Sequence, residues 1–422
     1  MTDASPNRSH RSRVVLGVSG GIAAYKACEL LRRLTESGHD VTVVPTEAAL
    51  RFVGSPTWEA LSGRTVSGSV FDDAAAVPHV RIGQQADLVV VAPATANLLA
   101  KAAHGQADDL LTTTLLTARC PVVFAPAMHT EMWEHPATRD NVATLRLRGA
   151  LVIPPAHGRL TGADSGAGRL PEPAELFALC VDVLRRGDAV RALDLSGRRV
   201  VVSAGGTREH LDPVRFLGNS SSGKQGYALA AAAVARGAEV TVVAANVALP
   251  EPAGAKVIRV GSTAELAEEV LSASRGADAV VMAAAPTDFK PVAAVEHKIK
   301  KRSDGSTPTI KLVETQDVLA TLVAQRVGQT GPILVGFAAE TGDQHASVLD
   351  YARAKLQRKG CDLLVVNDVT DGAVFGDDDN QAVVLATGRP DVAVPRGSKR
   401  DLAHAVWDEV SARLGTLPGE SA

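Results

Sequence analysis

Short runs of β-branched residues alternate with helical stretches along almost the whole chain of 422 residues. Five such runs fall in the first half, namely RVVLGV at 13–18, DVTVVP at 40–45, DLVVVAP at 87–93, PVVFAP at 121–126 and ALVIPP at 150–155. Helical stretches lie near 22–37 and 172–186. The alternation predicts a parallel sheet with helices on both faces, because parallel strands need crossover connections.

The same pattern starts again after a polar connection through Leu195. The strands expected there lie near 198–204, 238–244, 278–284, 332–338 and 361–366, followed by a hairpin near 373–396 and a closing helix from about 398. A chain of this length is too long for one ordinary core. We therefore expect a disordered N-terminus at 1–12 and two doubly wound α/β domains at 13–190 and 191–422.

Charge and cysteine content narrow the class of protein. A formal net charge of −3 gives no global attraction to nucleic acid or to an anionic membrane. No apolar run approaches the roughly 18 residues of a spanning helix, and the polar N-terminus has no signal-type core behind it. The four cysteines are far apart and form neither a metal-binding nor a disulfide pattern. These features favour a cytoplasmic protein without nucleic-acid or membrane partners.

Ligands of open parallel sheets bind beyond the carboxyl ends of the strands, so the residues that follow each strand are informative. The first strand runs into the glycine-rich turn Ser19-Gly20-Gly21, which opens a helix and can present free backbone N–H groups to a phosphate. The turn is not G-x-G-x-x-G, and the second strand ends at Thr46 instead of the acid that binds a ribose diol. A mononucleotide therefore fits better than a dinucleotide.

Four segments in the first half carry a family resemblance. SGGIAAYK, PHVRIG, APATANLLAK and PAMHTEMW, in this order, resemble the homo-oligomeric flavin-containing cysteine decarboxylases, which include phosphopantothenoylcysteine decarboxylase. The resemblance implies a flavodoxin-like domain with FMN as cofactor and His79 as the catalytic base. The implied FMN contacts are Ser19, Gly20, Gly21, Thr46, Pro93, Thr95 and Asn97, and the implied substrate contacts are Met128, His129 and Arg169.

This half departs from the family at two places. His129 stands where the family usually has an asparagine that holds the substrate carboxylate, and a histidine can still donate a hydrogen bond there. The stretch 162–170 resembles the family's substrate clamp but lacks the cysteine that normally supplies the final proton. The sequence therefore leaves the proton donor open.

The second half begins with SAGGTRE, DPVRF and GNSSSGK, which together resemble the phosphopantothenoylcysteine synthetase family. Gly223-Lys224 is not a P-loop, because Gln225 stands where Ser or Thr is required. The resemblance implies a Rossmann-like ligase domain in which Asn219 handles an acyl-cytidylate intermediate and Arg215 contacts substrate.

Nucleotide contacts follow from the same resemblance. A ligase that activates a carboxylate with CTP needs cations around the triphosphate and a divalent metal, here Mg²⁺. Lys355 and Lys359 are four residues apart and share a helical face. Gln316 departs from the Asn-Pro-Asp-Ile turn usual in the family, and no metal ligands stand out. The implied CTP contacts are Asp288, Lys298, Gln316, Asp317, Val318, Phe337, Lys355 and Lys359.

The sequence thus predicts a bifunctional enzyme of coenzyme A synthesis. Its second domain would join 4'-phosphopantothenate to cysteine with CTP, and its first would decarboxylate the product to 4'-phosphopantetheine. The resemblance also implies a homo-oligomer, a dodecamer of decarboxylase trimers and ligase dimers. Two alternatives remain: a tandem nicotinamide-binding oxidoreductase, which lacks its expected acid at Thr46 and Asn246, and a flavoprotein whose decarboxylase site is degenerate.

Overall fold

The computed structural model describes residues 11–66, 78–160, 164–187, 193–293, 295–300, 309–326, 331–340, 347–368 and 379–415. The chain divides between Leu193 and Asp194 into two compact units. The expected boundary at 190–191 and most of the expected disordered N-terminus, residues 1–10, lie outside the described residues. Both units are mixed α/β with mostly parallel sheets, which confirms the predicted fold class.

The first unit contains a five-stranded parallel sheet with the order β2-β1-β3-β4-β5. Its strands are β1 (Arg13–Val18), β2 (Asp40–Pro45), β3 (Leu88–Ala94), β4 (Val122–Pro126) and β5 (Leu151–Val152), and a separate hairpin joins β6 (Ala156–Arg159) to β7 (Ser165–Arg169). Its helices are α1 (Ala24–Glu36), α2 (Glu47–Leu50), α3 (Ser55–Ser62), α4 (Pro78–Gln85), α5 (Ala96–His104), α6 (Leu110–Thr117), α7 (Thr130–Glu134), α8 (Pro136–Leu147) and α9 (Pro173–Arg186).

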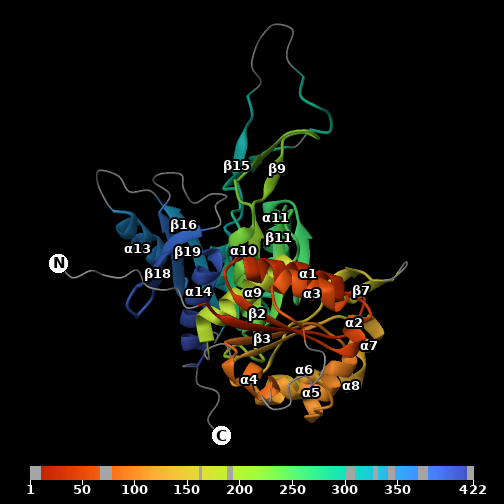
Figure 1. The fold of residues 1–422 in the computed structure, drawn as a ribbon. Coiled ribbons are helices and arrows are strands. Elements are labelled where there is room, and N and C mark those ends of the chain that lie inside the picture. Colours follow the sequence, from red (N-terminus) through yellow and green to blue (C-terminus); the bar gives the residue numbers. More distant parts are fainter. Residues whose placement is uncertain are drawn as a thin grey trace, which may run out of the picture. The chain divides into compact units, whose positions relative to one another are not determined.

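Helices cover both faces of this sheet. Figure 1 shows α1 and α3 on one face and α4, α5, α6 and α8 on the other. Helix α1 forms because Ala27, Leu30, Leu31 and Leu34 recur at helical spacing and are all buried. Strand β3 is buried along its whole length, as expected of a central parallel strand.

The second unit contains an eight-stranded sheet with the order β12-β11-β8-β13-β16-β17-β18-β19, in which only β18 and β19 run antiparallel to their neighbours. The strands are β8 (Arg199–Gly205), β11 (Glu239–Ala245), β12 (Ala255–Val260), β13 (Ala279–Met282), β16 (Ile333–Glu340), β17 (Leu363–Asp368), β18 (Asp379–Ala386) and β19 (Val392–Ser398). The helices are α10 (Lys224–Ala235), α11 (Thr263–Ala273), α12 (Val318–Arg326), α13 (Val348–Lys359) and α14 (Lys399–Leu414).

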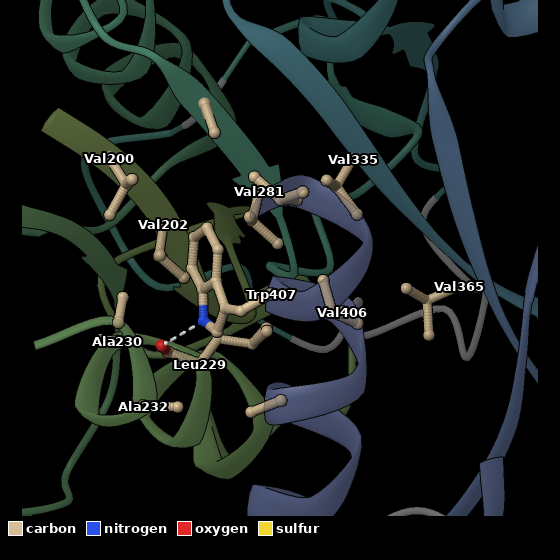
Figure 2. Close-up of a cluster of buried hydrophobic side chains, with 14 of the residues drawn as sticks. Val200, Val202, Leu229, Ala230, Ala232, Val281, Val335, Val365, Val406 and Trp407 are labelled. Atoms are coloured by element: carbon tan, nitrogen blue, oxygen red, sulfur yellow. Dashed lines mark hydrogen bonds between the residues drawn. The ribbon is translucent and has the colours of Figure 1, made fainter. Parts of the chain in front are cut away.

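One hydrophobic core lies on each face of this sheet. Helices α10 and α14 cover one face, where Trp407 is fully buried and its indole N–H donates to the carbonyl oxygen of Leu229 at 2.8 Å (Figure 2). Helices α11, α12 and α13 cover the other face. Arg236, 2% exposed, fastens the ends of the unit because it binds Asp194 at 2.8 Å and Asp408 of α14 at 2.7 Å.

Two short ribbons project from the second unit. Strands β9 (Arg208–His210) and β10 (Phe216–Gly218) form one, and β14 (Phe289–Pro291) and β15 (Leu312–Glu314) form the other. The N–H of Val295 donates to Leu211 at 3.2 Å and links them, and Figure 1 shows β9 and β15 extending away from the sheet. We call these two ribbons the arm. Among the described residues no helix is long and apolar enough to cross a membrane.

Candidate functional sites

The glycine-rich turn after β1 leaves three backbone donors open. Among the described residues, no acceptor takes the N–H groups of Gly20, Gly21 or Ile22. Gly20 is required because a Cβ there would lie 2.4 Å from the Cβ of Ala48. Open amides just before a 13-residue helix form a site for a phosphate group. The residues present therefore fit the phosphate of a flavin mononucleotide.

Ser19 braces two loops of this site. Its buried hydroxyl donates to the carbonyl oxygen of Pro93 at 2.8 Å and accepts from the N–H of Thr95 at 2.9 Å. Thr46 and Thr95 cap α2 and α5, accepting from the N–H groups of Ala49 at 3.2 Å and Leu98 at 3.4 Å. Both threonines still have an O–H to donate to a ligand.

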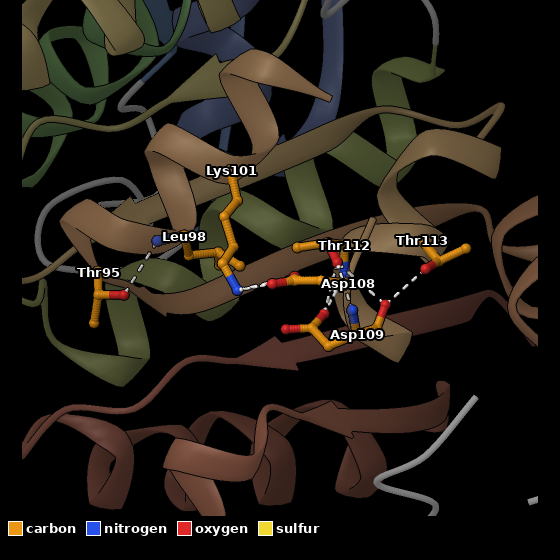
Figure 3. Close-up of polar contacts among 7 residues, drawn as sticks. All are labelled: Thr95, Leu98, Lys101, Asp108, Asp109, Thr112 and Thr113. Atoms are coloured by element: carbon orange, nitrogen blue, oxygen red, sulfur yellow. Dashed lines mark hydrogen bonds and ion pairs between the residues drawn. The ribbon is translucent and has the colours of Figure 1, made fainter. Parts of the chain in front are cut away.

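An ion pair and a helix cap stabilise the region around Thr95 and Asn97. Lys101 of α5 binds both carboxylate oxygens of Asp108 at 2.6 and 2.9 Å, and Asp109 caps α6 by accepting from Thr112 at 2.7 Å (Figure 3). Asn97 is exposed in the first turn of α5, whereas Pro93 is buried. Of these two predicted flavin contacts, the side chain of Asn97 is the accessible one.

His79 lies in the first turn of α4, which leads into β3. The N-terminus of such a crossover helix lies at the carboxyl edge of a parallel sheet, together with the turn after β1. The Nδ1 atom of His79 is buried and has no partner among the described residues. Thr117 of α6 donates to the carbonyl oxygen of His79 at 2.8 Å, and a Cβ on Gly83 would lie 2.2 Å from the same hydroxyl oxygen. Close packing of α4 on α6 therefore positions the histidine.

The segment after β4 packs against the hairpin of β6 and β7. The N–H of Met128 donates to the carbonyl oxygen of Gly168 at 3.0 Å, and a Cβ on Gly168 would lie 2.1 Å from the carbonyl oxygen of Met128. His129 is exposed, and its side chain makes no capping hydrogen bond. Arg169 binds Glu172 at 2.7 Å, and Glu172 also binds Lys26 at 3.0 Å. The start of the expected clamp, residues 162–163, lies outside the described residues.

In the second unit, backbone atoms of the chain occupy the space beside the glycine-rich turn. Gly205 has φ +83°, and a Cβ there would lie 2.1 Å from the carbonyl oxygen of Ala245, while one on Gly206 would lie 2.3 Å from that of Asn219. Asn246 donates to the carbonyl oxygens of Gly206 at 2.9 Å and Gly261 at 2.8 Å. Its amide is thus used structurally, and the turn has no carboxylate for a ribose diol.

A cavity of about 680 Å³ opens at the carboxyl edge of the second sheet. Its volume is in the usual range for small-molecule sites. The predicted residues that line it are Asn219, Asp288, Gln316, Asp317, Val318, Phe337, Lys355 and Lys359. Lys298 and Arg215, also predicted, are not part of its lining.

Charge in the cavity is arranged around α12 and α13. Lys359 forms an ion pair with Asp317, whose carboxylate also accepts from the N–H of Ala320 at 3.0 Å. Burial acts to raise the pKa of Asp317, but these hydrogen bonds hold it below its usual value. Lys355 lies one turn earlier on the same face of α13. Two lysines and one ionised aspartate give this wall a net positive charge.

Asn219 and Arg215 have different surroundings. The amide nitrogen of Asn219, which lines the cavity, donates to the carbonyl oxygen of Pro286 at 2.8 Å. Arg215 binds the buried Asp212 at 2.6 Å and the carbonyl oxygen of Ile299 at 2.9 Å. The guanidinium of Arg215 and neighbouring backbone N–H groups hold the pKa of Asp212 well below its usual range. Arg215 thus fixes the segment next to Lys298, which is itself exposed.

Further polar residues line the cavity that sequence reasoning missed. Gln225, Asn367, Asn380 and Lys399 are among them. Asn380 donates to the side-chain oxygen of Gln225 at 3.2 Å, and Gln225 donates to the carbonyl oxygen of Lys399 at 3.0 Å. Asn367 directly follows the apolar run expected at 361–366, so its place at the end of a parallel strand was an available signal.

Comparison with known proteins identifies the family of each half of the chain. Residues 2–185 match the family described as Flavoprotein, and residues 195–414 match the family described as DNA/pantothenate metabolism flavoprotein C-terminal domain. The chain is 59% identical over 402 residues to the coenzyme A biosynthesis bifunctional protein CoaBC of Mycobacterium tuberculosis (strain ATCC 25618 / H37Rv), covering 94% of this chain and 96% of the relative. It is 56% identical over 415 residues to the protein of the same name from Mycolicibacterium smegmatis, covering 97% and 100%.

The sequence of a crystal structure described as the C-terminal domain of coenzyme A biosynthesis bifunctional protein CoaBC is 32% identical to this chain. The match covers 53% of this chain and 98% of that chain, with a TM-score of 0.44.

Two α/β units, each with a candidate site at the carboxyl edge of its sheet, define a two-domain enzyme. The chain belongs to the family of bifunctional coenzyme A biosynthesis proteins, which confirms the resemblance found in the sequence. It is a bifunctional enzyme with a flavoprotein decarboxylase unit followed by a ligase unit.

Proposed function

We propose that the second unit joins cysteine to 4'-phosphopantothenate in a CTP-dependent reaction and that the first unit decarboxylates the product to 4'-phosphopantetheine. The cavity of the second unit carries this proposal. It brings Asn219 together with Lys355 and Lys359, which the sequence singled out from separate motifs. A shared cavity of suitable size supports a common substrate complex.

In the ligase reaction the carboxylate of 4'-phosphopantothenate would attack the α-phosphate of CTP and displace pyrophosphate. Lys355 and Lys359 would neutralise the charge that develops on the phosphates, with Mg²⁺ accompanying the nucleotide. Phe337 and Val318 supply the apolar surface of the cavity, and Asp288 and Gln316 supply polar groups. Asn219 would hold the resulting acyl-cytidylate while the cysteine amine displaces CMP.

In the decarboxylase the open amides of the turn at 20–22 would hold the phosphate of FMN, and Thr46, Thr95 and Asn97 would contact the rest of it. When bound, FMN supplies reversible oxidation of the substrate thiol, which creates the electron sink for loss of carbon dioxide. His79 would accept the substrate proton at its unpartnered Nδ1. Met128, His129 and Arg169 border the same edge and would orient the carboxylate.

We further propose that the protein works in the cytoplasm as a homo-oligomer, a dodecamer of decarboxylase trimers and ligase dimers. Exposed apolar side chains on the arm and near it, Phe289 at 50% and Val292 at 60%, support a contact between copies of the second unit. A mass measurement in solution tests the assembly, and a monomer would contradict it.

The direct test supplies purified protein with 4'-phosphopantothenate, cysteine, CTP and magnesium, and follows pyrophosphate and carbon dioxide separately. Release of both, with 4'-phosphopantetheine as product, is the expected result. Pyrophosphate without carbon dioxide would favour a degenerate flavoprotein unit, the alternative motivated by His129 and by the absent clamp cysteine. Release of neither would contradict both halves of the proposal.

A further inference from the structure

The cavity of the second unit has walls on both faces of its sheet. Gln316, Asp317 and Val318 lie at the start of α12, and Lys355 and Lys359 lie on α13, so these proposed nucleotide contacts belong to the face that α11, α12 and α13 cover. The loop from Asn219 to Gly223 leads into α10, which covers the opposite face. The activated acyl group at Asn219 therefore lies toward the α10 and α14 side.

Asn367 belongs to that second wall. Alternate residues of a strand point to opposite faces, and Leu363 and Val365 are packed in the core under α10 and α14, whereas Leu364 and Val366 belong to the other core. Asn367 continues the first series and lines the cavity at the carboxyl end of β17.

The side chains of Asn380 and Gln225 are hydrogen-bonded, whereas the side-chain oxygen of Asn367 has no partner among the described residues. Asn380 and Gln225 bind one another, and the remaining Asn380 oxygen accepts from the N–H of Gln381 at 2.9 Å. The Oδ1 atom of Asn367 is buried and has no donor among the described residues. A buried acceptor without a donor is unfavourable, so a ligand N–H that reaches this oxygen gains more than a new surface contact would give.

Hydrogen bonds of Gln225 connect the loop that carries Asn219 to the strand next to Asn367. Gln225 lies in the first turn of α10, directly after the loop from Asn219 to Gly223, and its bond to Asn380 joins that turn to β18. Strand β18 is the neighbour of β17, with Ala382 opposite Asn367. Asn219 and Asn367 thus line the cavity from the side of α10, whereas Lys355 and Lys359 line it from α13 on the other face of the sheet.

We propose that Asn367 is a binding residue for the amine of cysteine in the ligase reaction. The inference rests on the proposed function and names the site of its second substrate. Asn367 accepts a hydrogen bond from the amine and directs its lone pair to the acyl carbon. The attack forms the C–N bond and breaks the bond from the acyl carbon to the phosphate oxygen, so that CMP leaves. The protons released by nitrogen pass to water, because an amide oxygen is not a base.

The test measures the two half-reactions of the full-length protein separately. Exchange of labelled pyrophosphate into CTP, dependent on 4'-phosphopantothenate and run without cysteine, reports activation. CMP release at saturating CTP and 4'-phosphopantothenate, with cysteine varied, reports capture of the acyl group. Asn367→Leu is expected to raise the KM for cysteine about tenfold, the effect of one lost hydrogen bond, and to leave the exchange within about twofold of wild type.

Asn367→Asp keeps an acceptor of nearly the same shape and is expected to stay within about threefold of the wild-type KM for cysteine. Gln381→Ala removes an exposed amide from the same sheet edge and is expected to change neither half-reaction. The inference is overturned if Asn367→Leu raises the KM for CTP or slows the exchange while the KM for cysteine is unchanged. Absence of exchange in the wild-type protein would instead contradict the proposed function, and the inference with it.

Discussion

The two units share a doubly wound architecture but use their glycine-rich turns differently. In the first unit the turn at 20–22 has open amides, and a Cβ on Gly21 would meet only Thr95, at 3.6 Å. In the second unit Gly205 and Gly206 are packed against the carbonyl oxygens of Ala245 and Asn219. The first turn can hold a ligand phosphate, whereas the second lets the chain approach itself and moves the cavity along the sheet toward β13 and β16.

The two sites also differ in the charged side chains that they offer to a ligand. The first site offers backbone N–H groups, two threonine hydroxyls and the side chains of His79 and His129, while Lys26 and Arg169 are bound to Glu172. The second site places Lys355 and Lys359 on one wall. The two lysines agree with the proposed triphosphate, whose developing charge needs cations. A shared fold therefore does not fix the ligand; the loops at the carboxyl edge do.

The largest expected effect comes from replacing His79, which should affect the activity of the first unit and not that of the second. His79→Asn should lower carbon dioxide release from 4'-phosphopantothenoylcysteine by about 10²- to 10⁴-fold, because a positioned base is lost, while bound flavin and ligation are unchanged. Absorbance of the purified protein and the separate product assays check this. His104→Asn, an exposed histidine at the end of α5, is the matched control. Normal decarboxylation by the His79 variant would remove it from the mechanism.

The reciprocal variant is Lys359→Ala. Loss of one of the two lysines proposed to bind the triphosphate should slow pyrophosphate release by about 100-fold and leave decarboxylation intact. Rates at saturating CTP, with 4'-phosphopantothenate and cysteine, check the effect. Lys256→Ala, on β12 and outside the lining of this cavity, should behave as wild type. Equal loss in both reactions would mean that Lys359 acts on the fold or assembly instead of on the nucleotide.

A smaller effect is expected where packing alone positions a catalytic group. Gly83→Ala places a carbon 2.2 Å from the hydroxyl oxygen of Thr117, so α4 must move away from α6. We expect decarboxylation to fall about tenfold and stability to fall by about 1–3 kcal/mol, with ligation retained. Thermal unfolding and the carbon dioxide assay measure the two effects. In Gly54→Ala the added carbon meets Pro56 at an ordinary 3.6 Å, and an equal loss there would contradict the packing argument.

The smallest expected effect concerns the acid stability of the second unit. The folded pKa of Asp212 is held below its unfolded value of about 3.9, so its contribution is present above that pH and is lost as the pH falls through the folded pKa. Asp212→Asn should therefore lower stability near neutral pH and make it less dependent on pH below about 4. Denaturant unfolding of both proteins at several pH values tests this, and parallel pH curves would contradict it.

The sequence predicted the central strands of both sheets well, because each is a β-branched run buried on two faces. The expected run at 13–18 coincides with the central strand β1, that at 40–45 coincides with the edge strand β2, and the late hairpin appears as β18 and β19. Strand β12 and the ribbons of the arm were not predicted. β12 carries Lys256 and Arg259 and is only partly buried, so it lacks the apolar run on which such predictions depend.

The residues of the candidate site were predicted one by one from separate motifs, and the sequence did not show which of them meet. Asp317 and Lys359 came from different motifs, and the structure pairs them directly. Arg215 was predicted as a substrate contact, but the buried charge of Asp212 that it neutralises becomes visible only when the chain is folded. The position of Asn367 after a predicted strand was a usable signal, but its buried oxygen without a partner among the described residues depends on neighbours that only the folded chain brings together.

The buried Arg236 limits where the chain can be cut or fused between its two units. Its guanidinium holds Asp194, the first residue of the second unit, and Asp408 of the last helix. A cut or a fusion at Leu193 leaves both partners in place, whereas one made after Asp194 leaves a buried cation with half its counter-charge, which is strongly destabilising. The ion pair between Asp194 and Arg236 therefore places the upstream border of the ligase unit at Asp194.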